Sequence, residues 1–399
     1  MISLETLKIG ETNLKNWLKN MQENLSENSK FNFFKYKKYW RNVDKQVLIS
    51  FSLLFILGIF FSFSSTSFLA DERLNKEYYF FFQKHLIYAS FSFFVMVFIS
   101  LLNVSLINRT SLIIFLIFFL TLFLVPIIGT EVKGAKRWLG FLGLNFQPVE
   151  FIKPFFVLLV AKILTSKNIK SLNLSYVLSF VILFIISILL IGQPDLGQTI
   201  LLTVTWISLI FMSGVNIIFL IIFFISIIIS FFILLYFAAD KFGYIINRLS
   251  SFVDPGKTEN FQSQKAIEAI RQGGLKGHGM GEGILKESVP EAHTDYIIAV
   301  ISEEFGSIIS VLIVSIFLFV AFRVIKKIVN SSNDFYRLSL CGLISMLTFQ
   351  AFIHVGVNVN LLPTTGMTLP FLSYGGSSLL SSGIIAGIIL NYTSVTEKK

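Results

Sequence analysis

The sequence predicts an all-α polytopic integral membrane protein with about ten transmembrane helices and one large extracytoplasmic loop between the seventh and eighth helices. Of its 399 residues, 54% are apolar and only 14% are charged, whereas soluble domains carry about 25% charged residues. The apolar residues gather in long segments, and a helix of about 20 apolar residues crosses a bilayer core about 30 Å thick. A soluble globular domain is therefore excluded.

The apolar segments predict the spans in order along the chain. Backbone N–H and C=O groups in lipid need partners within their own segment, so each span is expected to be a helix. The clearest segments are residues 47–68, 112–128, 174–191, 217–238, 306–322 and 338–357. Shorter candidates, or candidates with a polar or glycine-bearing end, are residues 86–102, 148–164, 198–212 and 369–390.

Basic residues set the predicted orientation, because cytoplasmic loops carry an excess of Lys and Arg. With ten spans, the basic residues of the N-terminal stretch and of alternate connections all fall on one side, which makes both termini cytoplasmic. They include Lys38, Arg41, Arg109, Lys167, Lys170, Arg323, Lys327 and Arg337. The sequence is thus divided into a basic cytoplasmic segment (1–46), a membrane domain (47–392) and a cytoplasmic tail (393–399). This arrangement explains the net charge of +10 without a nucleic-acid partner.

Two connections on the outer side are too long and too charged to be simple turns. Residues 131–147 include Lys136 and Arg137 against the orientation rule, so these cations are candidates to meet an anion, or they are a solvated charge run. Residues 240–294 form the longest connection, in which 261–270 is predicted to be helical. The glycines of 273–283 predict a flexible stretch and do not have the spacing of a phosphate-binding loop, so no nucleotide is implied.

Asp295 is one candidate for chemistry. Ser288 and Glu291 have the spacing of a capping box and Pro290 suits a first turn, so a helix is predicted to begin near them. Asp295 follows Glu291 by four residues and would share its helical face. Asp295 is then either a first-turn carboxylate favoured by the helix dipole, or a general base or cation ligand at the outer membrane boundary.

A second candidate group begins the fourth predicted span. Ionisable residues inside a span normally face a partner or a cavity. Glu150 and Lys153, at i and i+3, could neutralise each other or bind a ligand, and their spacing does not decide between the two. The sequence predicts no metal centre built from Cys or His, because Cys341 is the sole cysteine and the histidines at 278, 293 and 354 lack metal-ligand spacing.

The chain contains, in order, the motifs GAKRW from Gly134, QPVEFIK from Gln147, QPDLG from Gln193, GGLKGHGMGEG from Gly273, PEAHTDYI from Pro290 and LPTTGMTLPFLSYGGSS from Leu362. Together they resemble the shape, elongation, division and sporulation (SEDS) family of bacterial membrane glycosyltransferases. Details at 42–44, 303–306 and 364–368 look more like the cell-division branch than the elongation branch. One departure is Val149, where the family often has Ser.

The resemblance implies a function and a set of site residues. It implies polymerisation of lipid II, a polyprenyl-diphosphate disaccharide-peptide, at the outer face of the cytoplasmic membrane during septal cell-wall synthesis, with Asp295 catalytic. It also implies a divalent cation, Mg²⁺ or Mn²⁺, held by Asp295 or elsewhere, and a class B penicillin-binding transpeptidase and other division proteins as partners. The residues it implies at the substrate are Lys136, Arg137, Gln147, Glu150, Lys153, His293, Thr294 and Ser373.

Two other classes of protein compete with this interpretation. A lipid II flippase or secondary transporter would also need many spans and intramembrane charge, and it would depend on a coupling ion. A non-catalytic division scaffold would tolerate the change Asp295→Ala.

Overall fold

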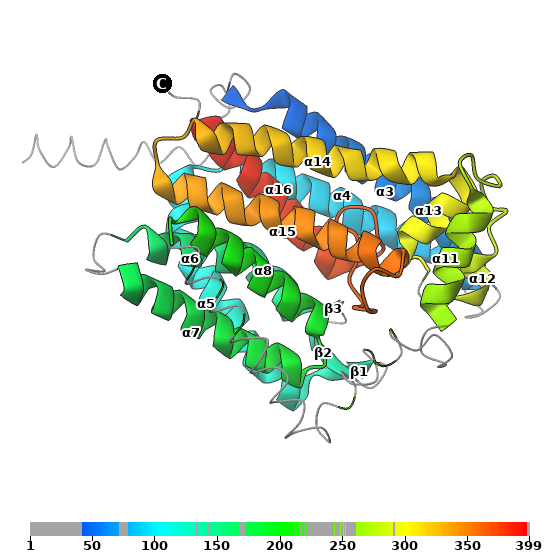
Figure 1. Ribbon diagram of the computed structural model, residues 1–399, viewed down its shortest axis with the longest axis horizontal. Helices are drawn as coiled ribbons and strands as arrows, with labels where there is room; N and C mark the ends of the chain where they lie inside the picture. The colour runs from blue at the N-terminus through cyan, green and yellow to red at the C-terminus, as the bar shows by residue number, and fades with distance from the viewer. Residues whose placement is uncertain are drawn as a thin grey trace, which may run out of the picture.

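Long helices form a bundle that carries a small β-sheet and several short helices at one end (Figure 1). The computed structural model describes residues 42–71, 79–132, 135–141, 144–166, 172–215, 261–289 and 292–396, with a few single residues between 216 and 260. The helices are α3 (Lys45–Asp71), α4 (Phe80–Leu101), α5 (Val104–Ile128), α6 (Pro148–Leu164), α7 (Leu172–Gly192), α8 (Leu196–Met212), α11 (Phe261–Gly273), α12 (Leu285–Ser288), α13 (Ile297–Phe305), α14 (Ser307–Val329), α15 (Asp334–Asn358) and α16 (Gly376–Thr396).

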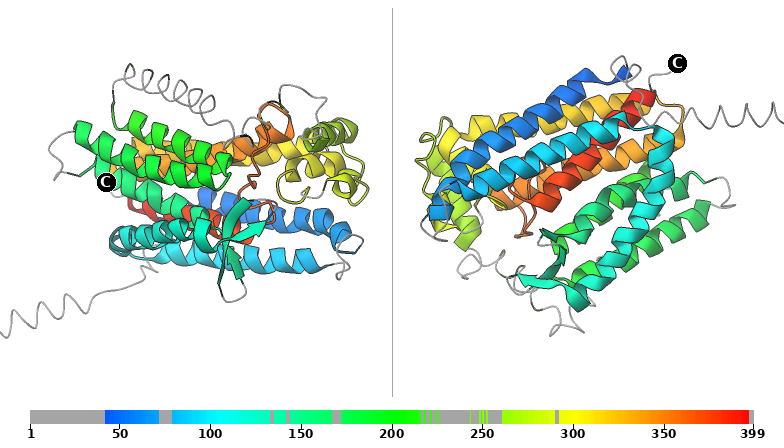
Figure 2. Two further views of the ribbon diagram at one scale, coloured as in Figure 1. Left: turned by 90° about the horizontal axis from the view of Figure 1, so that it is seen from below. Right: turned by 180° about the vertical axis from the view of Figure 1, so that it is seen from behind.

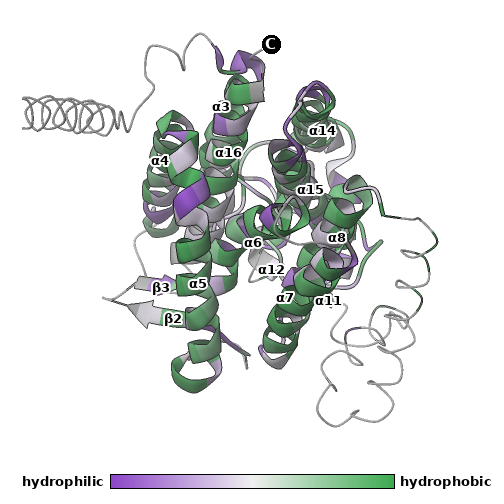
Figure 3. Cartoon of the chain, turned by 90° about the vertical axis from the view of Figure 1, so that its left-hand side faces the viewer, coloured by the Kyte–Doolittle hydropathy of each residue, from purple (hydrophilic) through white to green (hydrophobic). Residues whose placement is uncertain are grey.

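The polytopic membrane fold is confirmed. Within the described residues, seven helices are long and apolar enough to cross a bilayer, namely α3, α4, α5, α7, α14, α15 and α16. The predicted spans at 148–164 and 198–212 correspond to α6 and α8, apolar helices of 17 residues each. The predicted span at 217–238 lies outside the described residues apart from single positions. Hydrophobic residues dominate the length of these helices (Figure 3).

The helices divide into two groups (Figures 1 and 2). Helices α3, α4, α14, α15 and α16 lie together, and α5 to α8 form the second group beside them, with α15 and α16 in contact with α6. Burial separates central from peripheral spans: 78% of the apolar window of α16 is buried inside the bundle, against 22% for α5. Helix α16 therefore faces protein, whereas α5 is expected to face lipid.

Small residues bring α16 and α4 together. A Cβ added at Gly383 would lie 2.5 Å from the backbone oxygen of Ser92, and one added at Gly387 would lie 2.8 Å from that of Met96. Glycines four residues apart on one face let two membrane helices approach closely. Gly383 and Gly387 thus provide the close contact that places α16 against α4.

Both described ends of the chain lie at one end of the bundle (Figures 1 and 2). There Asp44 accepts hydrogen bonds from the backbone N–H groups of Gln46 and Val47, which caps α3. Its other carboxylate oxygen lies 2.8 Å from Arg323 Nη2 and 3.6 Å from Lys327 Nζ. The basic residues at the end of α14 are therefore tied to the start of the first span.

The opposite end holds a three-stranded antiparallel sheet, which the all-α prediction missed. Its strands are β1 (Thr130–Val132), β2 (Ala135–Phe141) and β3 (Leu144–Phe146), in the order β1-β2-β3. Glu131 lies opposite Lys136, and Gly140 lies opposite Asn145. Two residues, one of them glycine, separate each pair of strands in sequence, a spacing typical of β-hairpins.

The glycine-rich segment after α11, predicted to be flexible, is hydrogen-bonded to the end of α13 at two backbone positions, while most of its residues are exposed. His278 N and Gly279 N donate to the carbonyls of Glu303 and Glu304 at the end of α13. Gly277 has φ +80°, and an added Cβ there would meet the backbone of Glu304. Gly277 therefore lets the backbone of this segment approach the backbone of α13 closely. Helix α11 itself confirms the helix predicted at 261–270.

The last span starts later than predicted. Residues 362–375, here called the proline loop, lie in turns and irregular structure, and α16 begins only at Gly376. Pro363 and Pro370 provide no N–H for a helix and bias the residues before them toward extended backbone. The helix then continues to Thr396, four residues past the predicted end of the membrane domain.

Candidate active site

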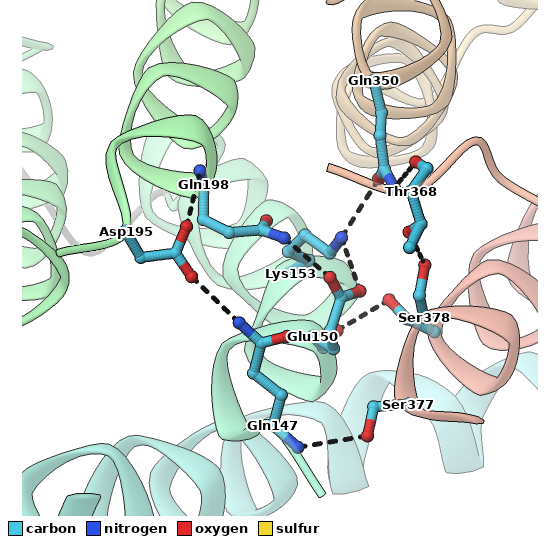
Figure 4. A network of polar contacts seen from close by, with 10 residues as sticks. Gln147, Glu150, Lys153, Asp195, Gln198, Gln350, Thr368, Ser377 and Ser378 are labelled. Carbon is cyan, nitrogen blue, oxygen red and sulfur yellow. Dashed lines mark hydrogen bonds and ion pairs between the residues drawn. The ribbon is translucent and has the colours of Figure 1, made fainter. Parts of the chain in front are cut away.

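Glu150 and Lys153 form an ion pair in the core of the bundle (Figure 4). The Lys153 Nζ lies 2.6 Å from Glu150 Oε2, and both side chains are almost fully buried. Gln198 Nε2 of α8 donates to Glu150 Oε1 at 2.7 Å, and Lys153 Nζ donates to Gln350 Oε1 of α15 at 3.0 Å. Of the two interpretations of this spacing, the structure shows the pairing, reinforced by neutral amides from two other helices.

A second carboxylate, Asp195, lies in the turn between α7 and α8. It caps α8 by accepting the backbone N–H of Gln198, and its Oδ2 accepts from Gln147 Nε2 at 2.9 Å (Figure 4). Burial raises the pKa of the Asp195 carboxyl, while nearby Arg137 and the Gln198 N–H act in the opposite direction. The turn is thus attached through Gln147 to the start of α6.

The two predicted cations differ in their surroundings. Arg137 donates from Nε to the carbonyl of Gln193 at 3.0 Å and from Nη2 to the carbonyl of Pro194. Lys136 is exposed, and successive side chains of a strand point to opposite faces. Arg137 therefore holds the turn before α8, and Lys136 points away from it.

Asp295 lies in a turn and not in a helix. The predicted helix start near Ser288 is wrong, because α13 begins at Ile297 and residues 292–296 form turns. Pro290 and Glu291, and with them the proposed capping box, lie outside the described residues. Asp295 is half-buried, and its Oδ2 would lie 3.6 Å from a Cβ added at Gly366 of the proline loop. The absence of a side chain at Gly366 leaves space beside this carboxylate.

Tertiary hydrogen bonds hold the backbone on either side of Asp295. Tyr374 N donates to the carbonyl of His293 at 3.2 Å, and Ser373 Oγ donates to that of Thr294 at 2.7 Å. The His293 ring packs on the rings of Phe81 and Tyr374, with centroids 5.7 and 5.5 Å away. Burial raises the pKa of Tyr374 to about 12, so its hydroxyl remains neutral at neutral pH.

The proline loop joins the two groups of predicted residues. Its Gly366 lies beside the Asp295 carboxylate, and its Ser373 donates to the carbonyl of Thr294. It also offers the carbonyl of Thr368 to Gln350 Nε2 at 2.9 Å, and Gln350 is the partner of Lys153. The structure therefore brings Asp295, His293, Thr294 and Ser373 into one connected region with Glu150 and Lys153.

His354 and His278 differ in their surroundings. His354 is buried, and its Nδ1 is 2.8 Å from the carbonyl of Met367. His278 is exposed and lines a pocket of about 520 Å³ with Gln272, Glu282, Ile284 and Glu303. Among the described residues, no group of three His, Cys, Asp or Glu side chains is arranged to hold a metal ion. A cation at Asp295 would therefore need most of its ligands from substrate and water, which is common for Mg²⁺ bound to phosphates.

Sequence reasoning missed four residues of this region: Asp195, Gln198, Gln350 and Asn358. Asp195 lies within the QPDLG motif, which was the signal for it, and Gln198 follows the motif directly. Gln350 and Asn358 flank His354 at intervals of four residues inside an apolar span. A polar stripe at helical spacing in a membrane helix indicates a buried protein-facing surface.

Known proteins match nearly the whole chain. The model of the cell cycle protein family of FtsW, RodA and SpoVE matches residues 44–398. The chain belongs to this family. A relative within it, the probable peptidoglycan glycosyltransferase FtsW of Caulobacter vibrioides, is 35% identical over 356 residues, covering 88% of this chain and 89% of that protein. The stage V sporulation protein E of Bacillus subtilis is 32% identical over 356 residues, covering 87% and 96%.

Solved structures of the FtsW, RodA and SpoVE family share the fold. The crystal structure of the Thermus thermophilus rod shape determining protein RodA matches with a TM-score of 0.66 at 21% identity, over 90% of this chain and 99% of that one. A chain of a peptidoglycan synthase complex matches with a TM-score of 0.72 at 21% identity, over the same shares. The family resemblance predicted from the motifs is confirmed.

Proposed function

We propose that this protein is a peptidoglycan glycosyltransferase that polymerises lipid II into glycan strands during septal cell-wall synthesis. The observation that carries the proposal is Asp295: a half-buried carboxylate beside Gly366, in a region connected to the buried Glu150–Lys153 pair. The relatives named FtsW, at 30 to 35% identity, support the reaction class and the division branch.

The proposed location is the bacterial cytoplasmic membrane at the division site. The basic residues of α14 and the described ends of the chain lie at one end of the bundle, which we assign to the cytoplasm. The sheet, α11, α12, α13 and the proline loop lie at the other end, which faces outward in this assignment. A substrate outside the cytoplasm must carry its own leaving group, because ATP is absent there, and a lipid diphosphate does so.

In the proposed reaction, the 4-hydroxyl of the acceptor sugar attacks the anomeric carbon of the growing strand. The hydroxyl proton passes to the carboxylate of Asp295, the new C–O bond forms, and the anomeric C–O bond breaks. Polyprenyl diphosphate leaves with the bonding electron pair, and the configuration inverts from α to β. The diphosphate becomes more negative as it leaves, and Lys153 or Lys136 is the proposed source of compensating charge.

Asp295 has an alternative role in the same reaction, as the protein ligand of a divalent cation. Mg²⁺ or Mn²⁺ bound there would neutralise charge on the diphosphate. A single carboxylate with substrate phosphates is an ordinary Mg²⁺ environment. The residues implied at the substrate on either route remain Lys136, Arg137, Gln147, Glu150, Lys153, His293, Thr294 and Ser373, with Arg137 acting through the turn that it holds.

The proposed partners are a class B penicillin-binding transpeptidase and other division proteins. A chain of similar fold is part of a peptidoglycan synthase complex, which supports a partner of this kind. No nucleic acid is needed to account for the basic residues.

Liposomes that hold the purified protein, its transpeptidase partner and lipid II distinguish the three candidate functions. Glycan strands resolved by gel electrophoresis indicate a polymerase. Transfer of a labelled lipid II between leaflets without glycan product would instead indicate a flippase. Binding of the partner with neither activity would indicate a scaffold.

A further inference from the structure

Helix α15 presents a column of three buried polar side chains toward the candidate site. Gln350, His354 and Asn358 are spaced four residues apart, so they lie on one face of the helix, and each is at most 1% exposed. Gln350 contacts Lys153 and the Thr368 carbonyl, and His354 contacts the Met367 carbonyl. The third member, Asn358, reaches the backbone of Asp295.

Asn358 is bonded on both sides of its amide. Its Nδ2 donates to the carbonyl of Asp295 at 3.0 Å and to that of His354 at 2.8 Å. Its Oδ1 accepts the backbone N–H of Ala299 at 3.0 Å. Ala299 is the third residue of α13, a helix whose N-cap residue, Tyr296, forms no side-chain capping bond. A side chain from α15 thus takes the role that an N-cap side chain normally has.

These contacts fix the turn that carries the Asp295 carboxylate. We propose that Asn358 is a positioning residue, which sets where the Asp295 carboxylate stands relative to Lys153 through the column of polar residues on α15. The inference rests on the proposed glycosyltransferase function. A reacting group displaced by about 1 Å can lose about 100-fold in rate, so loss of this amide should slow turnover more than it weakens substrate binding.

The test compares Asn358→Leu with Asn391→Leu. Leu has the same branching at Cγ as Asn, with two methyl groups in place of the amide oxygen and nitrogen, and adds no charge. Asn391 is also buried, and its Nδ2 donates to the carbonyls of Ile99, Ser100 and Leu102, in contacts between α16 and α4 that do not involve Asp295. Both variants lose hydrogen bonds to backbone carbonyls, so both should unfold at a lower temperature.

The kinetic readout is polymerisation of lipid II by the complex with the transpeptidase partner. Asn358→Leu should lower kcat by at least about tenfold with KM changed by less than about threefold, whereas the folded fraction of Asn391→Leu keeps the wild-type kcat. If Asn358→Leu does not fold, Asn358→Ser serves instead, because a Ser hydroxyl can bond the carbonyl four residues earlier in its own helix but is too short to hold Asp295.

Equal kcat values for the folded Asn358 and Asn391 variants would overturn the positioning role while leaving the glycosyltransferase in place. A change in KM alone would also overturn it. Absence of glycan product from the wild type would overturn the proposed function itself, so the two failures are distinguishable.

Discussion

Lys153 Nζ lies 2.6 Å from Glu150 Oε2, with both side chains at most 3% exposed. Two opposite charges so deep in an apolar bundle are maintained only by each other and by neutral partners such as Gln198 and Gln350. The pair therefore contributes to the folding of the bundle, in addition to its proposed role at the substrate. Variants of the two residues separate these contributions.

Removal of one member of the pair should destabilise the protein more than removal of both. Glu150→Gln or Lys153→Met leaves an uncompensated buried charge, at a cost of about 3–5 kcal/mol, whereas the double variant leaves none. Thermal unfolding in detergent measures this difference. A double variant that folds but makes no glycan would indicate a substrate role for the charges. Single variants as stable as the wild type would contradict the expectation that each charge of the pair compensates the other.

Arg137→Lys should destabilise the turn between α7 and α8. The guanidinium donates to two consecutive carbonyls, Gln193 and Pro194, and the single ammonium of Lys cannot reproduce this fork. We expect a loss of about 1.5–3 kcal/mol, the usual value of a hydrogen bond to a charged group, and a lower rate of polymerisation. Lys136→Ala is the matched control for stability alone, since this neighbour is exposed and should change stability by about 0.5 kcal/mol or less.

Gly383→Ala should separate α16 from α4. The added methyl group would stand 2.5 Å from the backbone oxygen of Ser92, and overpacking of this kind costs about 1–3 kcal/mol. Gly192→Ala provides the comparison, because a Cβ at that position meets no atom within 4 Å. The unfolding temperatures of the Gly383→Ala and Gly192→Ala variants are measured in the same detergent. Equal temperatures for the two variants would mean that the close contact between these helices is not needed.

Removal of divalent cations should stop polymerisation, and addition of Mg²⁺ or Mn²⁺ should restore it. The leaving diphosphate needs charge compensation that one lysine supplies only in part. Glycan synthesis measured with a chelator, and then with added metal, tests this expectation. Undiminished synthesis in the chelator would contradict it. In Asp295→Glu, a changed metal requirement would indicate a ligand role, and an unchanged requirement would favour the general base.

Hydropathy and motif spacing predicted the membrane fold, the helix at 261–270 and the proximity of Glu150 to Lys153. Local sequence patterns predicted the wrong helix start near Asp295, because hydrogen bonds to residues far away in the sequence determine the backbone conformation there. The carbonyls of His293, Thr294 and Asp295 accept bonds from Tyr374, Ser373 and Asn358, although an earlier helix start would have used them within the helix. Partners 63 to 81 residues away leave no trace in the periodicity around Asp295.

The sheet and the proline loop were missed for a related reason. Residues 130–146 are rich in charge and glycine, a composition that resembles a loop, and their pairing is with one another across two-residue connections. The proline loop is apolar enough to resemble a span, yet Phe371 within it has φ +68°, outside the helical region, and the helix starts only at Gly376. Apolarity alone does not distinguish a chain buried in protein from one that crosses lipid.

The catalytic role of Asp295 is tested most directly by lipid II polymerisation with the transpeptidase partner. The proteins compared are the wild type, Asp295→Ala and Asp334→Ala. Asp334 is an exposed carboxylate at the start of α15, paired with Arg337, and is the control for loss of an aspartate. With Asp295 as the catalytic residue, we expect glycan ladders from the wild type and from Asp334→Ala, and none from Asp295→Ala at equal folded protein. Ladders of wild-type length and yield from Asp295→Ala would contradict it.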